Sequence, residues 1–286
     1  MADKFEKITI VGLGVIGGSL AMRLSKLGYT VFGVDLNFDT INRAKTGKFI
    51  VEGDSEPQRF FEQSDLVVMA LYPNQIADYI CKYHNCLKQN CIIIDVAGLK
   101  SHFVEPINNT LRDDIDFVFC HPMAGREKKG FEYADDKVFD NANFIITPTT
   151  RNKKESVDKI VALAKQMNFG TIKCVTPEFH DKIIAFTSQL PHAIAVALIN
   201  SDTENSQTGD FVGDSYRDLT RIANINECLW SELFLNNSQN LLYMIEEFEK
   251  QLEIIKNAVK YGDKKTLENC FVMSTERRNK LNKQNK

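Results

Sequence analysis

The chain has 286 residues and a formal net charge of −3, and 43% of its residues are hydrophobic. This length suffices for about two domains of ordinary size. The nearly balanced charge gives no general attraction to nucleic acid, so anions must be bound by local groups of residues. No run of eighteen apolar residues occurs and residues 1–4 lack an apolar signal segment, so a cytoplasmic protein without nucleic-acid or membrane partners is expected.

Cysteine and histidine usage argues against disulfides and against a metal site. The seven cysteines include no C-x-x-C pair and several fall in apolar runs, which favours buried, reduced thiols. The five histidines are scattered along the chain rather than clustered, so no bound metal is expected.

A dinucleotide-binding signature begins the chain. Residues 7–11 are a short β-branched run that predicts a strand, and a glycine-rich turn and an apolar helical pattern ending near Gly28 follow it. In such a turn the first glycine allows tight reversal, the second lets the backbone approach a pyrophosphate, and the third lets helix and strand pack closely. The helix N-terminus offers N–H groups to the phosphates. The cofactor-binding residues predicted here are Gly12, Gly14, Val15, Ile16 and Gly17.

The second predicted strand, Thr30–Val34, ends at Asp35, which follows Gly17 by 18 residues. A carboxylate at this distance can accept hydrogen bonds from the ribose diol of an adenosine. Asp35 would repel a 2′-phosphate, and Leu36 and Asn37 supply no arginine to bind one, so NAD is expected rather than NADP. Glycines at this spacing also arise by chance in loops, but the flanking strand, helix and acid disfavour that explanation.

Five further apolar runs alternate with helical stretches, as in a parallel sheet covered on both faces. They span residues 65–71, 91–96, 117–120, 143–147 and 170–175. The expected fold is α/β: an N-terminal doubly wound Rossmann-type parallel sheet followed by an all-helical C-terminal domain. Ligands bind beyond the carboxyl ends of strands in such sheets, so the residues there should converge on one crevice. These are Gly14, Asp35, Tyr72, Gly98 and His121, with Leu71 and Pro73 also expected beside the cofactor.

After Pro177 the sequence pattern becomes helical. This change predicts a dinucleotide-binding domain over residues 1–175 and a helical substrate-binding and dimerisation domain over residues 176–286. Residues 178–201 predict a long apolar helix, which Pro191 would kink or split.

The rest of the helical half contains a loop, a long apolar pattern and a polar end. Residues 201–213 are polar and include two glycines, so they predict a loop. Residues 227–260 carry too much apolar surface for a lone exposed helix, so they bury one side in a partner subunit or within the domain. A homodimer through these helices is expected. Residues 264–286 should begin as a helix and end in a solvated basic tail.

His121 stands at a predicted strand end, immediately before Pro122. Proline biases the preceding residue toward extended backbone, which fixes where the imidazole points. With an ordinary pKa near about 6.5, this side chain could accept a hydroxyl proton as hydride leaves. An isolated histidine is more often structural, but the position of His121 in the predicted crevice favours a catalytic role.

Two arginines, Arg217 and Arg221, are spaced i, i+4 and would lie on one helix face, where Asp218 could pair with Arg221. Such a pair of arginines commonly holds a carboxylate. A solvated charged face is the equal alternative on the pattern alone.

Two further groups have both a functional and an ordinary explanation. His192, directly after Pro191, is either a ligand-binding group or a satisfied histidine inside an apolar helix. Glu127, Lys128 and Lys129 form a charged stretch that either covers the substrate or is simply solvated.

Several motifs together resemble the prephenate dehydrogenase family. The glycine motif is shared by many enzymes, but the histidine motif combined with the arginine motif is specific, and the order and spacing match along nearly the whole chain. The motifs are residues 12–20 (GLGVIGGSL), 95–100 (DVAGLK), 121–125 (HPMAG) with Glu127, 190–192 (LPH), and 217–223 (RDLTRIA) with Trp230.

The resemblance implies a reaction and a role for each motif. The family oxidises prephenate at its C4 hydroxyl with NAD, and loss of the ring carboxylate as carbon dioxide gives aromatic 4-hydroxyphenylpyruvate for tyrosine biosynthesis. His121 resembles the catalytic histidine that bonds this hydroxyl and assists its deprotonation. Arg221 resembles the arginine that grips a substrate carboxylate, with Asp218 as its orienting partner. His192 matches a histidine near the side-chain end of the substrate, and Glu127 an acid at the pocket entrance. The predicted substrate-binding residues are Arg221, His192, Arg217, Asp218, Glu127, Arg126 and Gly98.

Two residues depart from the family pattern. Many relatives carry a serine where this chain has Gly98, and its hydroxyl helps orient the catalytic histidine. A water or a backbone N–H would have to replace that bond to His121. Arg126 stands where a small hydroxyl residue is common, so it would add a contact to the substrate or an ion pair with Glu127.

Three other functions remain open on the sequence. Arogenate dehydrogenase performs the same chemistry on a substrate with an amino group in place of the keto group; His192 without an obvious extra acid beside it favours prephenate. An NAD sensor without turnover would not need both His121 and Arg221. Hydroxyacid and imine reductases usually use a lysine or another donor on the second-domain helix, which residues 189–193 lack. The chain ends without an appended amino-acid-binding domain, so any tyrosine feedback is expected at the active site.

Overall fold

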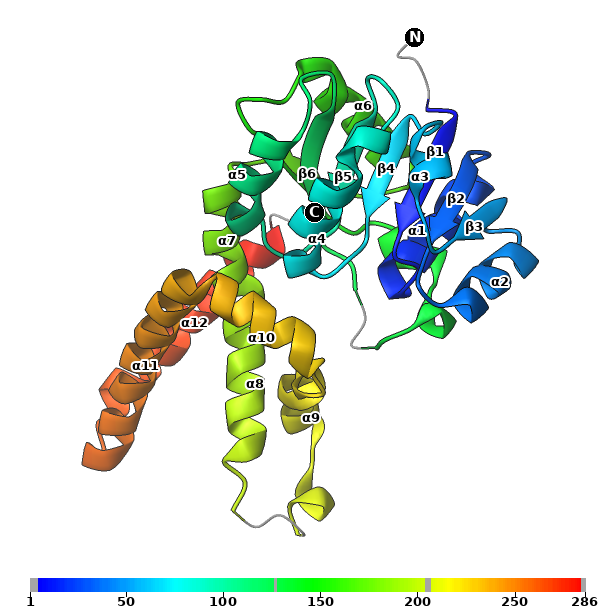
Figure 1. The fold of residues 1–286 in the computed structure, drawn as a ribbon. Coiled ribbons are helices and arrows are strands. Elements are labelled where there is room, and N and C mark those ends of the chain that lie inside the picture. The colour runs from blue at the N-terminus through cyan, green and yellow to red at the C-terminus, as the bar shows by residue number, and fades with distance from the viewer. Residues whose placement is uncertain (1–4, 126–127, 204–206, 284–286) are drawn as a thin grey trace. The chain divides into compact units, whose positions relative to one another are not determined.

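The computed structural model describes residues 5–125, 128–203 and 207–283 (Figure 1). The chain divides into two compact units between Asn237 and Ser238. The domain boundary predicted after residue 175 falls inside the first unit, which holds a sheet and the helices that follow it.

An eight-stranded sheet forms the core of the first unit, with the strand order β3-β2-β1-β4-β5-β6-β7-β8. All neighbouring strands are parallel except β6 and β7, which are antiparallel. The expected doubly wound α/β fold is therefore confirmed. The strands are β1 Lys7–Val11, β2 Thr30–Val34, β3 Glu52–Asp54, β4 Leu66–Met69, β5 Ile92–Asp95, β6 Asp116–Pro122, β7 Phe144–Thr147 and β8 Ile172–Cys174.

Two features of the sheet differ from the prediction. The short edge strand β3 was not predicted, because Glu52, Gly53 and Asp54 carry no apolar side chain. The prediction of parallel pairing was wrong for β7. A parallel neighbour needs a crossover, usually through an α-helix, whereas the described part of the β6–β7 connection contains only two 3₁₀ turns, Phe131–Tyr133 and Asp136–Phe139.

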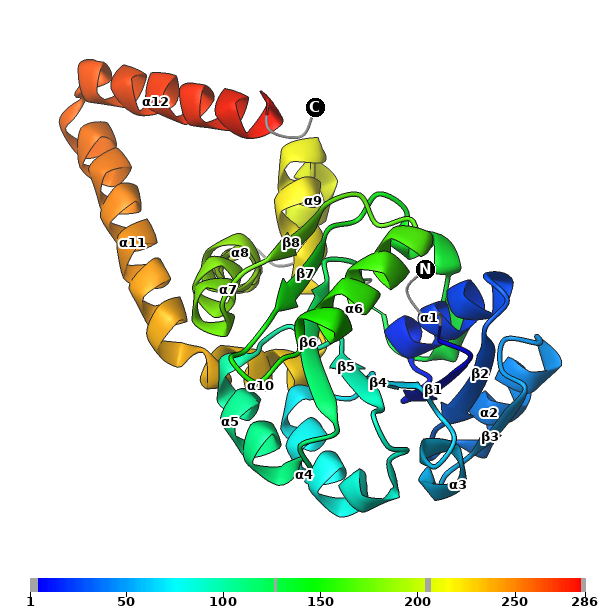
Figure 2. The same cartoon turned by 90° about the horizontal axis from the view of Figure 1, so that it is seen from above.

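Alternating side chains of the parallel strands enter two separate cores. In β4, Leu66 and Val68 pack with α1 (Val15–Lys26), α2 (Phe38–Thr46) and α6 (Lys154–Gln166). On the other face, Val67 and Met69 pack with α3 (Gln58–Phe61), α4 (Pro73–Tyr83) and α5 (Ser101–Thr110). Figure 2 shows α1 and α6 on one side of the sheet and α4 and α5 on the other. Burial on both faces explains why these strands are continuous apolar runs.

The helical part of the first unit follows Thr176. The predicted long helix is present as a continuous helical run, and a π-helical turn, Ala185–Gln189, lies in it directly before Leu190 and Pro191. A proline cannot donate the backbone hydrogen bond of a regular helix, and the wider turn accommodates this loss. The elements are α7 Pro177–Ile184, α8 Leu190–Asn200, α9 Asp214–Thr220, a 3₁₀ turn Arg221–Ala223 and α10 Glu227–Asn236.

Pro177–Asn200 is also the one stretch of the described chain that is long and apolar enough to cross a membrane. The core helix of a soluble protein and a signal sequence can have the same length and composition. The finding by itself therefore assigns no membrane location.

The helix predicted over residues 227–260 is interrupted at Asn237, so this prediction was wrong. Asn237 has φ −125° and ψ 26°, outside helical geometry. Its buried side-chain amide donates to the Asp181 carbonyl at 2.9 Å and to Gln189 Oε1 at 2.8 Å. The tertiary hydrogen bonds of Asn237 thus accompany a break that the apolar periodicity did not reveal.

The second unit consists of α11 (Ser238–Tyr261) and α12 (Lys264–Lys283), joined through Gly262 at φ 68°. The predicted helical start of residues 264–286 is confirmed. Several large apolar side chains of these helices are exposed: Leu242, Leu252, Ile255, Val259, Phe271 and Val272.

All seven cysteines are free thiols. Cys91 and Cys120 are buried, as expected from their apolar surroundings. The prediction of buried thiols fails for Cys81, Cys174 and Cys228, which are exposed.

Replacing Asn237 with alanine should lower the free energy of unfolding by about 1–3 kcal/mol, because two acceptors in a buried site lose their donor. The matched change at the neighbouring Asn236, whose amide bonds Asn74 at the surface, should cost less than about 1 kcal/mol. Urea unfolding of both variants measures the difference. Equal losses would show that the Asn237 bonds contribute nothing specific.

Candidate active site

The structure places the five predicted crevice residues at one edge of the sheet. Gly14, Asp35, Tyr72, Gly98 and His121 follow or end β1, β2, β4, β5 and β6, and these strands are all parallel. The carboxyl ends of parallel strands meet at the same edge, which is where α/β sheets bind ligands.

The glycine-rich turn has the geometry of a dinucleotide cradle. Gly12 has φ +89°, and a β-carbon there would collide with the Ala70 carbonyl oxygen. A β-carbon on Gly17 would collide with the Gly12 carbonyl oxygen, so this glycine is needed where α1 packs against the turn. Gly14 precedes the first turn of α1, formed by Val15 and Ile16, and a β-carbon there would meet no described atom within 4 Å. The open space beside this helix N-terminus fits a pyrophosphate.

Asp35 is held beside this turn by two backbone hydrogen bonds. Its Oδ2 accepts from Leu13 N at 2.7 Å, and its Oδ1 accepts from Asn37 N at 2.8 Å. Asn37 in turn caps α2. The carboxylate is therefore fixed at the end of β2, where a ribose diol would lie in this fold.

The predicted cofactor loop after β4 is bound to α10. Tyr72 caps α4 with extended backbone, Pro73 is the first helical residue, and Leu71 packs on the sheet core. The Tyr72 hydroxyl lies 3.1 Å from the side-chain amide of Asn226, just before α10. The loop on the cofactor side is thus connected to the helical part, a link that the sequence did not indicate.

His121 belongs to a chain of three hydrogen-bonded side chains. Its Nδ1 lies 2.9 Å from Nε2 of His180, and Nδ1 of His180 lies 2.8 Å from Oδ1 of Asp181. The same carboxylate accepts backbone hydrogen bonds from Lys100 N at 3.0 Å and Ser101 N at 2.8 Å. His180 and Asp181 are buried on α7, so this helix supplies the support of His121.

Sequence reasoning missed His180 and Asp181. The available signal was a pair of adjacent polar residues in the apolar run over residues 177–200. His121 and His180 are 59 positions apart in the sequence, so no local pattern reveals their contact.

The missing hydroxyl at Gly98 is explained by this arrangement. A β-carbon on Gly98 would lie 3.9 Å from Cε1 of His121 and 3.4 Å from Cδ2 of Leu233. A side chain at position 98 would therefore stand beside the imidazole. The hydrogen-bond partner of the His121 ring in this structure is His180, rather than the water or backbone N–H that was expected.

A buried ion pair fixes the turn between β5 and α5. Lys100 Nζ bonds Oδ2 of Asp95 and, at 2.8 Å, the Ala97 carbonyl, and both charged side chains are fully buried. Oδ1 of Asp95 accepts from Cys120 N at 2.9 Å, directly before His121. Burial raises the pKa of Asp95, and the ammonium of Lys100 opposes this rise.

The surroundings of His121 keep its imidazole neutral. Enclosure by protein lowers the pKa of His121 well below its ordinary value, with His180 and Lys100 adding to the effect, although part of the residue reaches solvent. Burial alone would raise the pKa of Asp181, but the hydrogen bonds from His180 and Ser101 outweigh it and lower this pKa. A neutral histidine next to a carboxylate-bound partner is suited to accept a proton.

His192 lies on α8 and faces α10. Its ring stacks on the indole of Trp230 with centroids 3.6 Å apart, and its Nδ1 lies 2.8 Å from the Ser188 carbonyl. Trp230 meets Phe234 edge to face. The histidine is therefore held by an aromatic side chain rather than surrounded only by aliphatic ones.

The predicted arginine pair is not on one regular helix face. α9 ends at Thr220, and Arg221 begins a 3₁₀ turn that packs on α8. Arg217 pairs with Asp214 at 2.6 Å, three residues earlier. Arg217 and Asp218 are exposed.

The charged stretch after Gly125 is only partly described. Arg126 and Glu127 lie outside the described residues. Lys128 sits over the Tyr133 ring, and Lys129 lies 3.9 Å from Glu227 at the start of α10. Both lysines make these contacts while remaining exposed.

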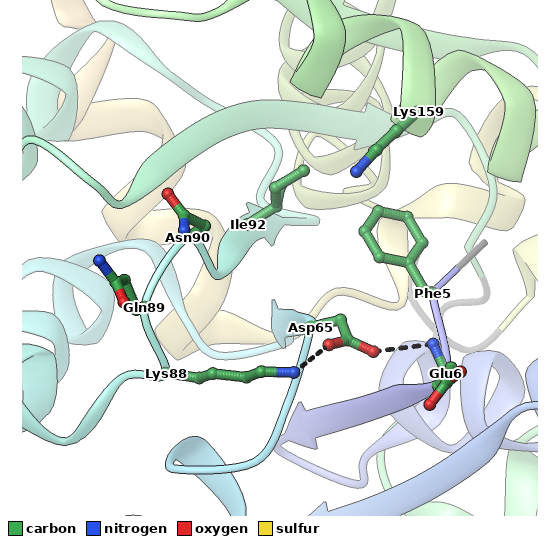
Figure 3. Close-up of a pocket in the computed structure, with 8 residues that line it drawn as sticks. All are labelled: Phe5, Glu6, Asp65, Lys88, Gln89, Asn90, Ile92 and Lys159. Carbon is green, nitrogen blue, oxygen red and sulfur yellow. Dashed lines mark hydrogen bonds and ion pairs between the residues drawn. The ribbon is translucent and has the colours of Figure 1, made fainter. Parts of the chain in front are cut away.

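A cavity of about 620 Å³ lies at the opposite edge of the sheet (Figure 3). Its residues precede or begin strands, except for Lys159 from α6: Phe5, Glu6, Asp65, Lys88, Gln89, Asn90, Ile92 and Lys159. The Asp65 carboxylate there is already bonded to Lys88 at 2.6 Å and to Glu6 N at 2.8 Å. This cavity is distinct from the crevice that contains His121.

The sequence matches two family models. The one described as "Prephenate dehydrogenase, nucleotide-binding domain" matches residues 19–173, and "Prephenate dehydrogenase, dimerization domain" matches residues 176–273. The chain is 27% identical to prephenate dehydrogenase of Bacillus subtilis over 96% of this chain and 76% of that protein. It is also 27% identical to cyclohexadienyl dehydrogenase of Zymomonas mobilis, over 91% of this chain and 90% of that one.

Solved structures agree with these matches. Prephenate dehydrogenase from A. aeolicus, in complex with hydroxyphenyl propionate and NAD+, superposes with a TM-score of 0.87 at 28% identity, covering 98% of this chain and 99% of that one. Synechocystis arogenate dehydrogenase has a TM-score of 0.82 at 23% identity, covering 96% and 99%, and shares the fold.

Alanine at the two glycines of the turn should have different effects. Gly17→Ala places a methyl group against backbone and should lower the free energy of unfolding by about 1–3 kcal/mol. Gly14→Ala has room for its methyl group and should keep wild-type stability, while NADH binds at least about tenfold more weakly because the pyrophosphate is held away from the backbone. Thermal unfolding and NADH fluorescence titration test both. Unchanged NADH affinity in Gly14→Ala would contradict the cradle.

Proposed function

Because the chain belongs to the prephenate dehydrogenase family, we propose that it oxidises and decarboxylates prephenate to 4-hydroxyphenylpyruvate in tyrosine biosynthesis, with NAD as its cofactor. The observation that carries the proposal is the support of His121. Its Nδ1 is engaged by His180, so Nε2 is the nitrogen that can receive a hydroxyl proton. An oxidoreductase that acts on an alcohol needs such a base beside the hydride acceptor.

NAD fits the residues at the carboxyl edge. The glycine turn leaves space for a pyrophosphate and Asp35 presents a fixed carboxylate to a ribose diol. A carboxylate at this position disfavours a 2′-phosphate, which supports NAD over NADP. When bound, NAD supplies the hydride acceptor.

The proposed task of the protein is to hold the substrate and move one proton. His121 Nε2 takes the proton of the C4 hydroxyl as hydride leaves C4, which gives a carbonyl. The ring carboxylate then leaves as carbon dioxide, its bonding electrons make the ring aromatic, and the phenolate oxygen takes back a proton. Aromatisation drives the reaction, so positioning and proton transfer suffice.

The substrate contacts are proposed on the family pattern. Arg221 would bind a carboxylate, with Asp218 orienting it, and His192 on its Trp230 platform would face the side-chain end of the substrate. Arg217, Arg126, Glu127 and Gly98 complete the proposed substrate site. The contact of the Arg221 turn with α8, which carries His192, supports this grouping.

The choice of prephenate over arogenate is also part of the proposal. The ammonium group of arogenate would favour a carboxylate partner. In the proposed site, the residue at the side-chain end of the substrate is instead a histidine, His192. Relatives with 27–28% identity carry the name prephenate dehydrogenase, and one with 27% the name cyclohexadienyl dehydrogenase.

We further propose a cytoplasmic homodimer that uses the C-terminal helices. The family model described as a dimerization domain covers residues 176–273, and α11 and α12 expose apolar side chains such as Leu252 and Val259. Large exposed apolar surfaces mark interaction sites. We place the boundary between the cofactor-binding and helical domains at 175/176, which the limits of the two family models support.

Purified protein should produce NADH from prephenate and NAD, and do so faster than with arogenate or with NADP. Absorbance of NADH measures all the combinations. A preference for arogenate would keep the catalytic roles and change the substrate, while no turnover of either compound would refute the enzymatic proposal.

His121→Asn should lower kcat by on the order of a hundredfold or more, because the substrate hydroxyl loses its base. NADH affinity should stay close to wild type, since His121 is not part of the glycine cradle. Steady-state kinetics and NADH titration test this. A parallel loss of cofactor affinity would contradict the proposed role.

Arg221→Ala should mainly raise the KM for prephenate, because a substrate carboxylate loses its partner. Arg217→Ala is the matched comparison, because Arg217 already pairs with Asp214, and its effect on KM should be smaller. Substrate saturation curves of both variants measure this difference in KM. An unchanged KM in Arg221→Ala would refute the proposed position of the carboxylate.

A further inference from the structure

In the proposed mechanism His121 alone moves the proton. In the structure, however, this histidine is linked to two buried side chains. His180 and Asp181 are 3% and 4% exposed, at the centre of α7. A buried carboxylate and a buried imidazole are costly unless they are hydrogen-bonded. Here every link of the line Asp181–His180–His121 is 2.8–2.9 Å long. Such an arrangement can fix both the orientation and the protonation of the last ring.

We propose that Asp181 and His180 are positioning residues that hold His121 in the tautomer with Nδ1 protonated and Nε2 free to accept the substrate proton. The inference rests on the proposed function, in which His121 is the base. It deepens that function by naming the groups that prepare this base.

The directions of the hydrogen bonds follow from the carboxylate. Asp181 is an acceptor, so Nδ1 of His180 must donate to it. The proposal takes His180 with a single ring proton, the one on Nδ1, so that its Nε2 has a lone pair and accepts. The donor in this contact is therefore Nδ1–H of His121, which leaves Nε2 of His121 with its lone pair. The alternative tautomer would set two lone pairs against each other across 2.9 Å.

The carboxylate of Asp181 is held by the turn between β5 and α5 as well as by His180 of its own helix. Asp181 accepts hydrogen bonds from Lys100 N and Ser101 N at the start of α5. A small apolar cluster fastens α7 and α10 to the same turn, with Leu99, Ile184 and Leu233 buried in it. The β5–α5 turn thus aligns Asp181 from one side while β6 presents His121.

The charges around His121 favour a ring that accepts the substrate proton and returns it, rather than one that stays protonated. Enclosure and the nearby ammonium of Lys100 lower the pKa of His121 well below its ordinary value, so the ring readily gives a proton back. Asp181 acts in the opposite sense, because its negative charge stabilises an imidazolium two hydrogen bonds away. Four titratable or charged groups lie around the hydrogen-bonded line Asp181–His180–His121. They are Asp95 of β5, Lys100 of the following turn, His102 of α5 and Cys120 of β6.

The tautomer can be observed without turnover. Long-range ¹H–¹⁵N correlation spectra of the full-length protein show which ring nitrogen of each histidine is protonated, and the His121→Asn spectrum assigns His121. We expect a protonated Nδ1 and an unprotonated Nε2 on His121 at neutral pH. A proton on Nε2 instead would overturn the proposal.

Two replacements of His180 separate hydrogen bonding from mere packing. His180→Leu removes the acceptor and should lower kcat by on the order of tenfold or more, with little change in KM or NADH affinity. His180→Gln retains an acceptor oxygen and should recover part of this loss. His84→Asn makes a like change at the end of α4, outside the chain of three, and should leave kcat unchanged. An unchanged kcat in His180→Leu would overturn the proposal.

Asp181→Asn tests the charge. Without the carboxylate the protonated form of His121 is less favoured, so its pKa falls further. The acid limb of the kcat profile should therefore move to lower pH while the plateau drops. A lower plateau with an unmoved limb would indicate a purely structural role and overturn the proposal. Should this variant fail to fold, the tautomer in the wild-type protein still decides.

The two proposals fail in distinguishable ways. If the wild-type protein turns over neither prephenate nor arogenate, the proposed function fails, while the spectra still test the hydrogen-bonded chain. If turnover is present but His121 carries its proton on Nε2, the function stands and the positioning role of His180 and Asp181 is refuted.

Discussion

The proposed active site depends on one buried carboxylate, that of Asp181. It receives two backbone N–H groups from the start of α5 and the imidazole of His180 from its own helix. Through His180 it reaches His121 at the end of β6. Helix α7, the start of α5 and the end of β6 are thus linked through the side chain of Asp181. Because a buried carboxylate without partners is strongly destabilised, the site can form only when these elements are docked together.

The β5–α5 turn carries a second buried charge that supports the first. Lys100 is paired with Asp95 inside the protein while its backbone N–H serves Asp181. Asp95 also receives Cys120 N, so the residue before His121 is fixed by the same carboxylate. Buried ion pairs contribute little net stability by themselves, but they hold neighbouring groups in defined positions. The β5–α5 turn therefore positions both His121, the proposed base, and Asp181, which is linked to it through His180.

The two edges of the sheet are used differently. At the carboxyl edge, Gly12 lies where a side chain would collide with the Ala70 carbonyl, and Gly14 leaves open space beside the N-terminus of α1. Gly98 belongs to the same edge, and its lack of a side chain leaves the imidazole of His121 to be supported from α7. At the amino edge, the Asp65 carboxylate in the cavity is satisfied by hydrogen bonds within the protein. The carboxyl edge is the one at which α/β sheets bind ligands.

The sequence by itself determined every strand except β3, the glycine turn and the position of the proposed base, His121. Strands buried on both faces are apolar throughout, and a glycine turn must satisfy local steric rules, so both are visible in a few consecutive residues. The family motifs added the substrate and the proposed roles of Arg221 and His192. Only the tertiary structure decided the antiparallel β7, the break at Asn237 and the support of His121 by His180. Each of these results from contacts between residues far apart in the chain, and local periodicity carries no information about such contacts.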